Sequence, residues 1–113
     1  MMKKVKKVTP DLIFSEPRLV AIYDTFDGVR DDLLPYVVLL KELKAKHVTD
    51  LGCGTGALSI LLGEEGMEVL AIDPAEASID LARAKPGASK VNWLVGDVSD
   101  IPVESTDAVV MAG

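Results

Sequence analysis

Three glycines alternate with other residues in one short turn, and this turn restricts the fold more than any other feature of the chain. They are Gly52, Gly54 and Gly56 in LGCGTGALSI, and the apolar stretch HVTDL runs directly into them. Glycine adopts backbone angles that are closed to other residues, and a turn without side chains leaves its main chain accessible. A strand, a glycine-rich turn and a helix in succession indicate a ligand-binding turn in an α/β sheet. A tight turn without a ligand is the alternative.

From His47 onward, strand-like and helix-like segments alternate. The predicted strands are residues 47–51, 67–73, 91–97 and 106–113, and the predicted helices are residues 57–66 and 74–85. The second of these helices would have Asp73 as its cap and Pro74 at its first position. Such alternation predicts an α/β fold with a doubly wound parallel sheet and right-handed crossovers.

The segment before the core is divided differently. Residues 1–16 lack periodicity and predict a frayed N-terminal tail, whereas apolar residues at helical spacing predict helices over residues 17–26 and 31–45. Pro35 fits the second helix if it lies in the first turn. The predicted organisation is therefore a tail at 1–16, a helical lid or cap at 17–46, and a core at 47–113.

Composition excludes several classes of protein. At 113 residues the chain has room for one small domain, and its net charge of −6 argues against a nucleic-acid surface. The longest apolar run, YVVLL, is too short to span a bilayer. A single cysteine, Cys53, cannot form an internal disulfide, which favours a reducing, cytoplasmic setting.

The acid before the glycine turn bears on the type of ligand. GCGTGA also fits the loose dinucleotide pattern G-x-G-x-x-G/A, through Gly52, Gly54 and Ala57. However, the carboxylate of Asp50 would repel a pyrophosphate and attract an ammonium group. Asp50 therefore favours a ligand with a cationic end, with an acid that orders the loop as the alternative.

Two further acids end the next two predicted strands. Asp73 is placed to accept hydrogen bonds from both hydroxyls of a ribose, a device that adenosine binders share, and a plain helix cap is its alternative role. Asp97 would lie at an adenine edge, where its carboxylate could accept from an exocyclic amine and the Val98 amide could donate to a ring nitrogen. A capped turn is the alternative for Asp97.

Together these segments resemble a known family. VTDLGCGTGALSILL, VLAIDPAEASIDLARAK, VNWLVGDVSDIP and TDAVVMAG are similar to the first four strands of the S-adenosylmethionine-dependent methyltransferases with a Rossmann-like core. The resemblance covers about residues 18–113, and its D-x-G-x-G-x-G motif begins at Asp50. It implies a Rossmann-like sheet of order 3-2-1-4, S-adenosyl-L-methionine as cofactor, and methyl transfer to an acceptor.

The resemblance also implies roles for residues of the first two strands. Asp50 would hold the amino group of the methionine portion. The turn residues Gly52, Cys53, Gly54 and Gly56 would line the methionine portion and the sugar. Asp73 would bind the ribose hydroxyls, with Pro74 beside it at the cofactor.

The remaining implied roles fall at the third and fourth strands and before the core. Asp97 and Val98 would contact the adenine, and Met111 would approach the sulfonium and its methyl group. In similar proteins a preceding helix closes over the cofactor, and Tyr23 is the candidate for that contact, with Arg30 as a partner for the carboxylate.

The resemblance has limits. Such domains usually carry seven strands, so this chain is expected to be part of a longer enzyme. The segment 106–113 would then be an open sheet edge through which the chain could self-associate. A small-molecule acceptor is favoured, with no nucleic-acid or membrane partner. A nicotinamide-dependent oxidoreductase and a non-catalytic S-adenosylmethionine-binding domain are the alternatives.

No general base or metal site is predicted. His47, the one histidine, precedes the first strand at the end away from the expected site. Cys53 has no histidine placed to activate it, and a small residue suits the turn. Methyl transfer is an in-line displacement, so the protein's main tasks would be to align the acceptor and to exclude water.

Overall fold

The computed structural model describes residues 6–8 and 32–112, and the account below is confined to them. The strands are β1 (Lys6–Val8), β2 (His47–Leu51), β3 (Glu68–Asp73), β4 (Val91–Val95) and β5 (Ala108–Val110). The helices are α3 (Leu34–Glu42), α4 (Ala57–Glu64) and α5 (Glu76–Arg83), with 3₁₀ turns η1 (Ala88–Lys90) and η2 (Val98–Asp100). All the strand pairs are parallel, and the strands lie in the order β1-β5-β2-β3-β4.

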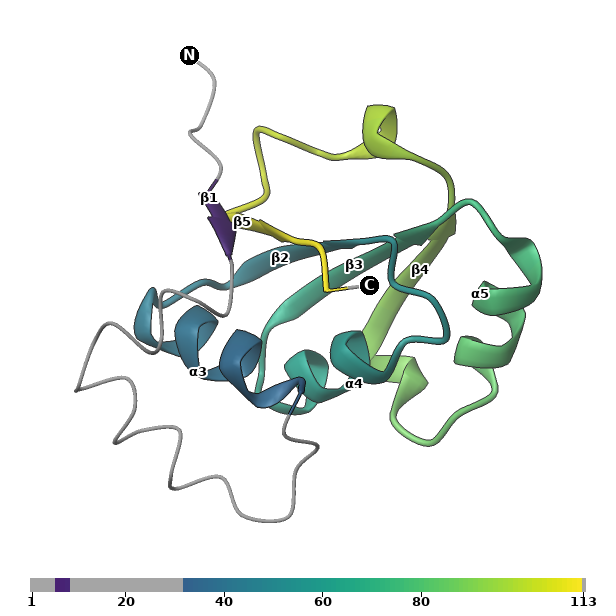
Figure 1. The fold of residues 1–113 in the computed structure, drawn as a ribbon, viewed down its shortest axis with the longest axis horizontal. Coiled ribbons are helices and arrows are strands. Elements are labelled where there is room, and N and C mark those ends of the chain that lie inside the picture. The colour runs from purple at the N-terminus through teal and green to yellow at the C-terminus, as the bar shows by residue number, and fades with distance from the viewer. Residues whose placement is uncertain (1–5, 9–31, 113) are drawn as a thin grey trace.

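The predicted sheet is confirmed. The four predicted strands correspond to β2, β3, β4 and β5, and their order in space, β4-β3-β2-β5, is the predicted 3-2-1-4. In Figure 1, α3 and α4 lie beneath the sheet, and the connection that contains η2 lies above it. Asp50 pairs with Ala71, and Asp73 pairs with Val95. The carboxyl ends of β2, β3 and β4 therefore meet at one edge, where ligands bind in open α/β sheets.

The prediction of an open edge at the fourth strand is wrong. Lys6, Lys7 and Val8 pair with Ala108, Val109 and Val110, so β1 lies on the outer side of β5. The predicted N-terminal tail therefore contains a strand. Three residues are too few to show strand periodicity, which is why the sequence did not reveal it. Self-association through β5 would require β1 to leave that edge.

The start of α5 also differs from the prediction. The helix begins at Glu76 with Ala75 at the N-cap, so Asp73 and Pro74 both precede it. Asp73 still contacts this end, because its Oδ1 accepts a hydrogen bond of 2.8 Å from the Ala75 amide. Asp73 serves the turn before the helix, in the manner of an Asx turn.

Helix α3 belongs to the core. It is shorter than the predicted helix over residues 31–45, since it begins at Leu34 and ends at Glu42. Pro35 lies in its first turn, as predicted, and all its residues from Leu34 to Leu40 are buried. A helix that is apolar on every side is stable only when it is covered on every side. Its apolar side chains join those of α4, β2 and β3 in one hydrophobic cluster. The lid predicted over residues 17–46 thus depends on residues 17–31, which lie outside the described ranges.

A tryptophan supports the glycine turn from below. Trp93 of β4 is partly buried, and its Nε1 donates a hydrogen bond of 3.0 Å to the carbonyl of Ala88. A Cβ built on Gly56 would collide with this ring, at 2.7 Å from Cζ3, and would lie 3.1 Å from the Cβ of Ala82. Gly56 is therefore required by close packing as well as by its φ of +85°.

Within the described ranges, no helix is long and apolar enough to cross a membrane.

Replacing Gly56 with alanine tests this packing. Gly56→Ala should lower the free energy of unfolding by about 3 kcal/mol, because it adds a collision with Trp93 to the strain of a positive φ. Gly66→Ala is the matched control, since Gly66 has a φ of +90° and open space around its Cβ position. That control should cost about 1 kcal/mol. Urea denaturation followed by circular dichroism measures both values, and equal losses would contradict the packing role of Trp93.

Candidate functional site

The glycine turn leaves the end of β2 as an open loop of main chain. Gly52, Gly54 and Gly56 have φ values of +72°, +58° and +85°. The amides of Gly52 and Cys53 donate to the carbonyl of Ile72 at 2.8 and 3.1 Å, which holds the loop against β3. A Cβ on Gly52 or Gly54 would meet nothing within 4 Å, so the space beside the loop is open. The loop thus offers a backbone surface on which a ligand can lie.

Asp50 is buried beneath this loop with half of its carboxylate unpartnered. Its side chain lies at the end of β2 and is 1% exposed. Oδ2 accepts a hydrogen bond of 2.6 Å from the Ser59 hydroxyl on α4, and Oδ1 is buried without a partner among the described residues. Burial raises the pKa of Asp50 to about 6, against the hydrogen bond from Ser59, and the charge of Asp73 raises it further. A buried carboxylate oxygen without a donor is costly unless a ligand supplies one.

Asp73 orders the loop. Its Oδ2 accepts a hydrogen bond of 2.9 Å from the Gly54 amide, while its Oδ1 holds the Ala75 amide. The loop-ordering role that the sequence left open for Asp50 therefore falls to Asp73. Each carboxylate oxygen accepts more than one hydrogen bond, so these contacts leave Asp73 able to accept from hydroxyl groups as well.

The residues after β4 form a local cap. Asp97 precedes η2, and its Oδ1 accepts hydrogen bonds from the hydroxyl and the amide of Ser99 at 2.6 and 2.9 Å. These bonds lower the pKa of the Asp97 carboxyl. In return Asp100 accepts from the Asp97 amide at 2.9 Å, which completes a capping box. The capped turn that the sequence left open is therefore present. Val98 is 67% exposed at the first position of η2.

A cavity of about 200 Å³ lies where the glycine loop meets α3 and α4. The predicted site residues that line it are Asp50, Gly52, Cys53, Gly54 and Gly56. The other described lining residues are Asp32, Leu33, Thr55, Ala57, Leu58 and Ala112.

The remaining predicted residues lie outside this cavity. Asp73 is joined to it through Gly54, and Asp97 follows the next strand, where the Gly96 amide bonds the Asp73 carbonyl at 3.1 Å. Pro74 is exposed beyond β3, and Met111, 42% exposed, follows β5 next to the lining residue Ala112. Tyr23 and Arg30 lie outside the described residues.

The comparisons with known proteins agree on one family. The model of the methyltransferase domain family matches residues 48–113, which is more than half of the chain. The chain belongs to this family.

Individual relatives carry methyltransferase names. The chain is 37% identical over 81 residues to the cypemycin N-terminal methyltransferase of a Streptomyces species, covering 71% of this chain and 33% of that protein. A solved structure from Listeria monocytogenes is described as a candidate S-adenosylmethionine-dependent methyltransferase and is 32% identical to this chain, with a TM-score of 0.53. The match covers 64% of this chain and 38% of the Listeria chain.

A more distant structure shares the fold. The plantazolicin methyltransferase BpumL, solved with SAH and a desmethylplantazolicin analogue, is 17% identical to this chain, with a TM-score of 0.55. The match covers 90% of this chain and 44% of the BpumL chain. The chain spans about a third of the length of the curated relatives that it matches.

Sequence reasoning missed two polar residues of this methyltransferase domain. Ser59 is fully buried against Asp50, and Thr55 lines the cavity beside the glycines. A signal for Ser59 exists in ALSILL, where one hydroxyl interrupts an apolar run on the helix that follows the loop. Such a buried hydroxyl needs a partner, and Asp50 is the nearby acceptor in sequence.

Cys53 is unsuited to nucleophilic chemistry. Burial raises the pKa of its thiol to about 12, and the charges of Asp50 and Asp73 raise it further. Its Sγ donates to the Gly54 carbonyl at 3.6 Å. A thiol of this pKa stays protonated at neutral pH, so Cys53 acts as a small residue of the loop.

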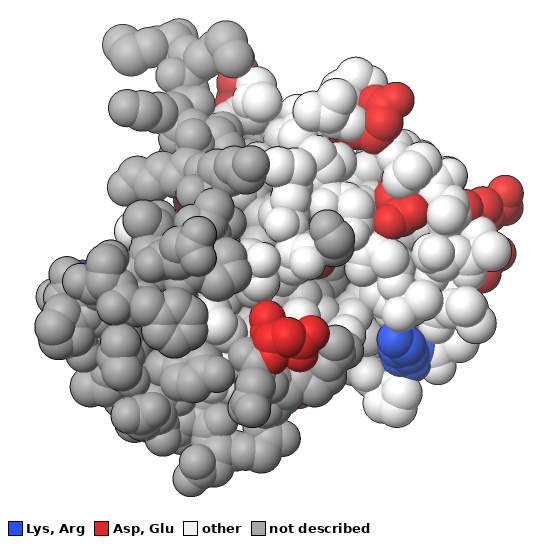
Figure 2. Space-filling view, viewed as in Figure 1, with Lys and Arg blue, Asp and Glu red and all other residues white. Residues whose placement is uncertain are grey.

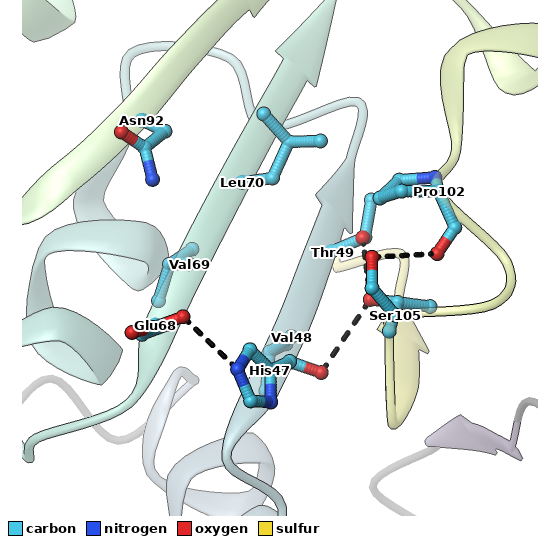
Figure 3. A pocket seen from close by; sticks show the side chains of 10 residues that line it. His47, Val48, Thr49, Glu68, Val69, Leu70, Asn92, Pro102 and Ser105 are labelled. Carbon is cyan, nitrogen blue, oxygen red and sulfur yellow. Dashed lines mark hydrogen bonds and ion pairs between the residues drawn. The ribbon is translucent and has the colours of Figure 1, made fainter.

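His47 lies at the opposite end of the strands, as predicted. Its Nε2 is 3.0 Å from Oε2 of Glu68, and its Nδ1 is 3.5 Å from Oδ2 of Asp107. Figure 3 shows His47 with Glu68 beside a second cavity, of about 100 Å³, whose lining includes Thr49, Pro102 and Ser105. The Thr49 and Thr106 hydroxyls are 2.7 Å apart and satisfy each other there. These contacts join the starts of β2, β3 and β5 and are structural.

The buried carboxyl of Asp50 predicts a specific dependence of stability on pH. Its pKa rises from 3.8 in the unfolded chain to about 6 in the fold, so the folded state binds more protons between these values. The contribution of Asp50 to the free energy of unfolding is therefore fully present below about pH 4 and is lost as the pH rises through about 6.

Asp50→Asn removes this titration. The unfolding free energy of the variant minus that of the natural chain should therefore increase by about 2–3 kcal/mol as the pH rises from about 4 to about 7. Urea denaturation of both proteins across that range measures the difference, and other groups cancel because both chains carry them. A difference that does not vary with pH would contradict the burial of an ionising Asp50.

Proposed function

We propose that this domain binds S-adenosylmethionine in the cavity beside the glycine loop and takes part in methyl transfer to a small molecule. The observation that carries the proposal is the buried Oδ1 of Asp50, which lacks a donor and belongs to a residue that lines that cavity. An ammonium group has three donors and the opposite charge. The amino group of a bound amino acid moiety therefore satisfies Asp50.

The other proposed site residues each contact a different part of the cofactor. The open backbone at Gly52 and Gly54 receives the central part of the cofactor, and Asp73 accepts from its ribose hydroxyls while it holds the loop. Asp97 and Val98 receive the adenine. One oxygen of Asp97 is engaged by Ser99, and the Val98 amide has no partner within η2 because it begins that turn.

The end of β5 completes the proposed site. Met111, next to the lining residue Ala112, faces the reacting end of the cofactor, and Pro74 and Tyr23 are proposed to pack around it. When bound, S-adenosylmethionine supplies a methyl group that is already activated on a sulfonium. The chain's own residues then need to hold the ligand, align an acceptor and exclude water.

Cys53, Asp50 and His47 are unsuited to act as a general base. Cys53 stays protonated, Asp50 is engaged with Ser59, and His47 lies at the other end of the strands. An acceptor that is itself a good nucleophile would need no base.

A dinucleotide is disfavoured as the ligand. The buried carboxylate of Asp50 would lie near its pyrophosphate, and both Asp50 and Asp73 already disfavour negative charge at Cys53.

The proposed setting is the cytoplasm, with a small-molecule acceptor and no nucleic-acid or membrane partner. The net charge of −6 argues against a nucleic-acid partner. Figure 2 adds that acidic side chains are scattered over the described part of one face, where basic surface is scarce. An anionic polymer would be repelled by such a face.

Calorimetric titration with S-adenosylhomocysteine, with NAD as the competing candidate, tests the cofactor. We expect micromolar binding of S-adenosylhomocysteine and no binding of NAD. Asp50→Asn and Asp73→Asn should each weaken binding by about tenfold or more, since each removes a charge-assisted contact. Asp80→Asn, which removes an exposed acid from α5, is the matched control and should bind normally.

A thermal melt on each sample confirms that the variants are folded. Tight binding of NAD, or equal binding of S-adenosylhomocysteine by all three variants, would overturn the assignment of the cofactor.

The affinity for S-adenosylmethionine should also depend on pH. Below about pH 6 the Asp50 carboxyl of the free protein takes up a proton and loses its attraction for a cation. The dissociation constant should therefore rise as the pH falls through this value, by at most about tenfold per unit from this group. Calorimetry over this range measures it, and an Asp50→Asn variant with the same slope would contradict the assignment to Asp50.

A further inference from the structure

We propose that the Thr55 hydroxyl, oriented by Lys85, binds the carboxylate of the amino acid end of the cofactor. The inference rests on the proposed function, because it concerns the same cavity. It adds Thr55, which occupies a variable position of the glycine motif, and Lys85, which lies outside the motif.

The first observation is a contact between distant parts of the chain. Lys85, in the turn after α5, donates a hydrogen bond of 3.1 Å from Nζ to Oγ1 of Thr55 in the glycine loop. An ammonium group can only donate, so the Thr55 oxygen is the acceptor. The hydroxyl proton of Thr55 therefore points away from Lys85 and is available for another acceptor.

The second observation is the chemistry of the cavity lining. Among the described residues that line the cavity, the side chains able to donate a hydrogen bond at neutral pH are those of Cys53 and Thr55. Cys53 uses its thiol proton on the Gly54 carbonyl. Thr55 is therefore the side-chain donor that remains for a bound anion.

The third step follows from the proposed function, which places an anion in this cavity. If Asp50 holds the amino group, the carboxylate lies close by, because both groups of an amino acid are attached to one carbon atom. Asp50 and Thr55 line the same cavity from the two ends of the loop. A carboxylate beside Asp50 needs donors and positive charge, and the Thr55 hydroxyl with Lys85 behind it provides both.

The loop is built to hold Thr55 at this place. Gly54 on one side is bonded to Asp73, and Gly56 on the other side packs on Trp93. Thr55 lies between these two fixed points, and Lys85 restricts its side chain. A carboxylate accepts several hydrogen bonds, so Arg30, proposed from the sequence for the same group, is compatible with Thr55.

Two ligands that differ only in the amino acid end test the inference. S-adenosylhomocysteine carries that end, and methylthioadenosine lacks it. Thr55→Val keeps the shape of the side chain and removes the hydroxyl, so it should weaken S-adenosylhomocysteine by about tenfold and leave methylthioadenosine unchanged. Thr55→Ser keeps the hydroxyl and should bind both ligands nearly as the natural chain does.

Lys85 is tested as a positioning residue. Lys85→Ala should weaken S-adenosylhomocysteine by about threefold to fivefold and spare methylthioadenosine, and Lys85→Arg should restore most of the loss. Lys90→Ala, which removes an exposed lysine after α5, is the matched control. If Lys85 acts through Thr55, the loss of S-adenosylhomocysteine affinity in the Thr55→Val, Lys85→Ala double variant should be smaller than the sum of the losses in the two single variants.

The outcomes separate the two proposals. Failure of the natural chain to bind S-adenosylhomocysteine would overturn the proposed function, and this inference with it. Normal binding by Thr55→Val, or equal weakening of both ligands, would overturn the inference alone, because a loop that is merely distorted affects both ligands.

Discussion

The site depends on one carboxylate that joins three segments of backbone. Asp73 ends β3, accepts the amide of Gly54 in the glycine loop, and accepts the amide of Ala75 before α5. Three glycines in five residues give a loop little order of its own, since each gains more conformational freedom in the unfolded chain than other residues do. The loop therefore keeps its shape through external contacts, of which Asp73, the Ile72 carbonyl and Trp93 are the main ones.

The second acid works against stability. Asp50 is buried with one oxygen unpartnered, so its charge is retained in the fold at an energetic cost. A leucine or alanine at this position would pack with less penalty, but it would offer nothing to a cation. This is the arrangement expected where a protein gives up stability for binding. Ser59 limits the cost by satisfying the other oxygen.

Most of the sheet could be predicted from the sequence, because its strands and helices alternate and the glycine turn marks where β2 becomes α4. The order of the four core strands followed from the resemblance and is confirmed. Strand β1 could not be predicted, since Lys6–Val8 is three residues long and is defined only by its partner β5. The start of α5 was placed two residues early because Asp73-Pro74 resembles a helix cap. In the structure Asp73 instead binds the amides of Gly54 in the loop and of Ala75 in the turn before the helix.

The candidate site was predictable where a motif carried it. Asp50, before the glycines, and Asp73, at the end of β3, lie beside the loop, and Asp97 forms the capping box that its sequence also allowed. The roles of Thr55 and Lys85 were not predictable, because they arise from a contact between segments that are distant in the chain. Ser59 was missed although its hydroxyl interrupts an apolar run close to Asp50. Close packing of Trp93 on Gly56 belongs to the same class, since only the fold brings β4 beneath the loop.

The position of β1 has a consequence for the order of assembly. Its partner, β5, lies about 100 residues later in the chain, whereas β2, β3 and β4 are joined by short crossovers. Closing so long a loop is slow compared with local pairing. During synthesis β1 therefore has no partner in this sheet until β5 follows, and we expect Lys6–Val8 to join the sheet only after β2, β3 and β4 have formed.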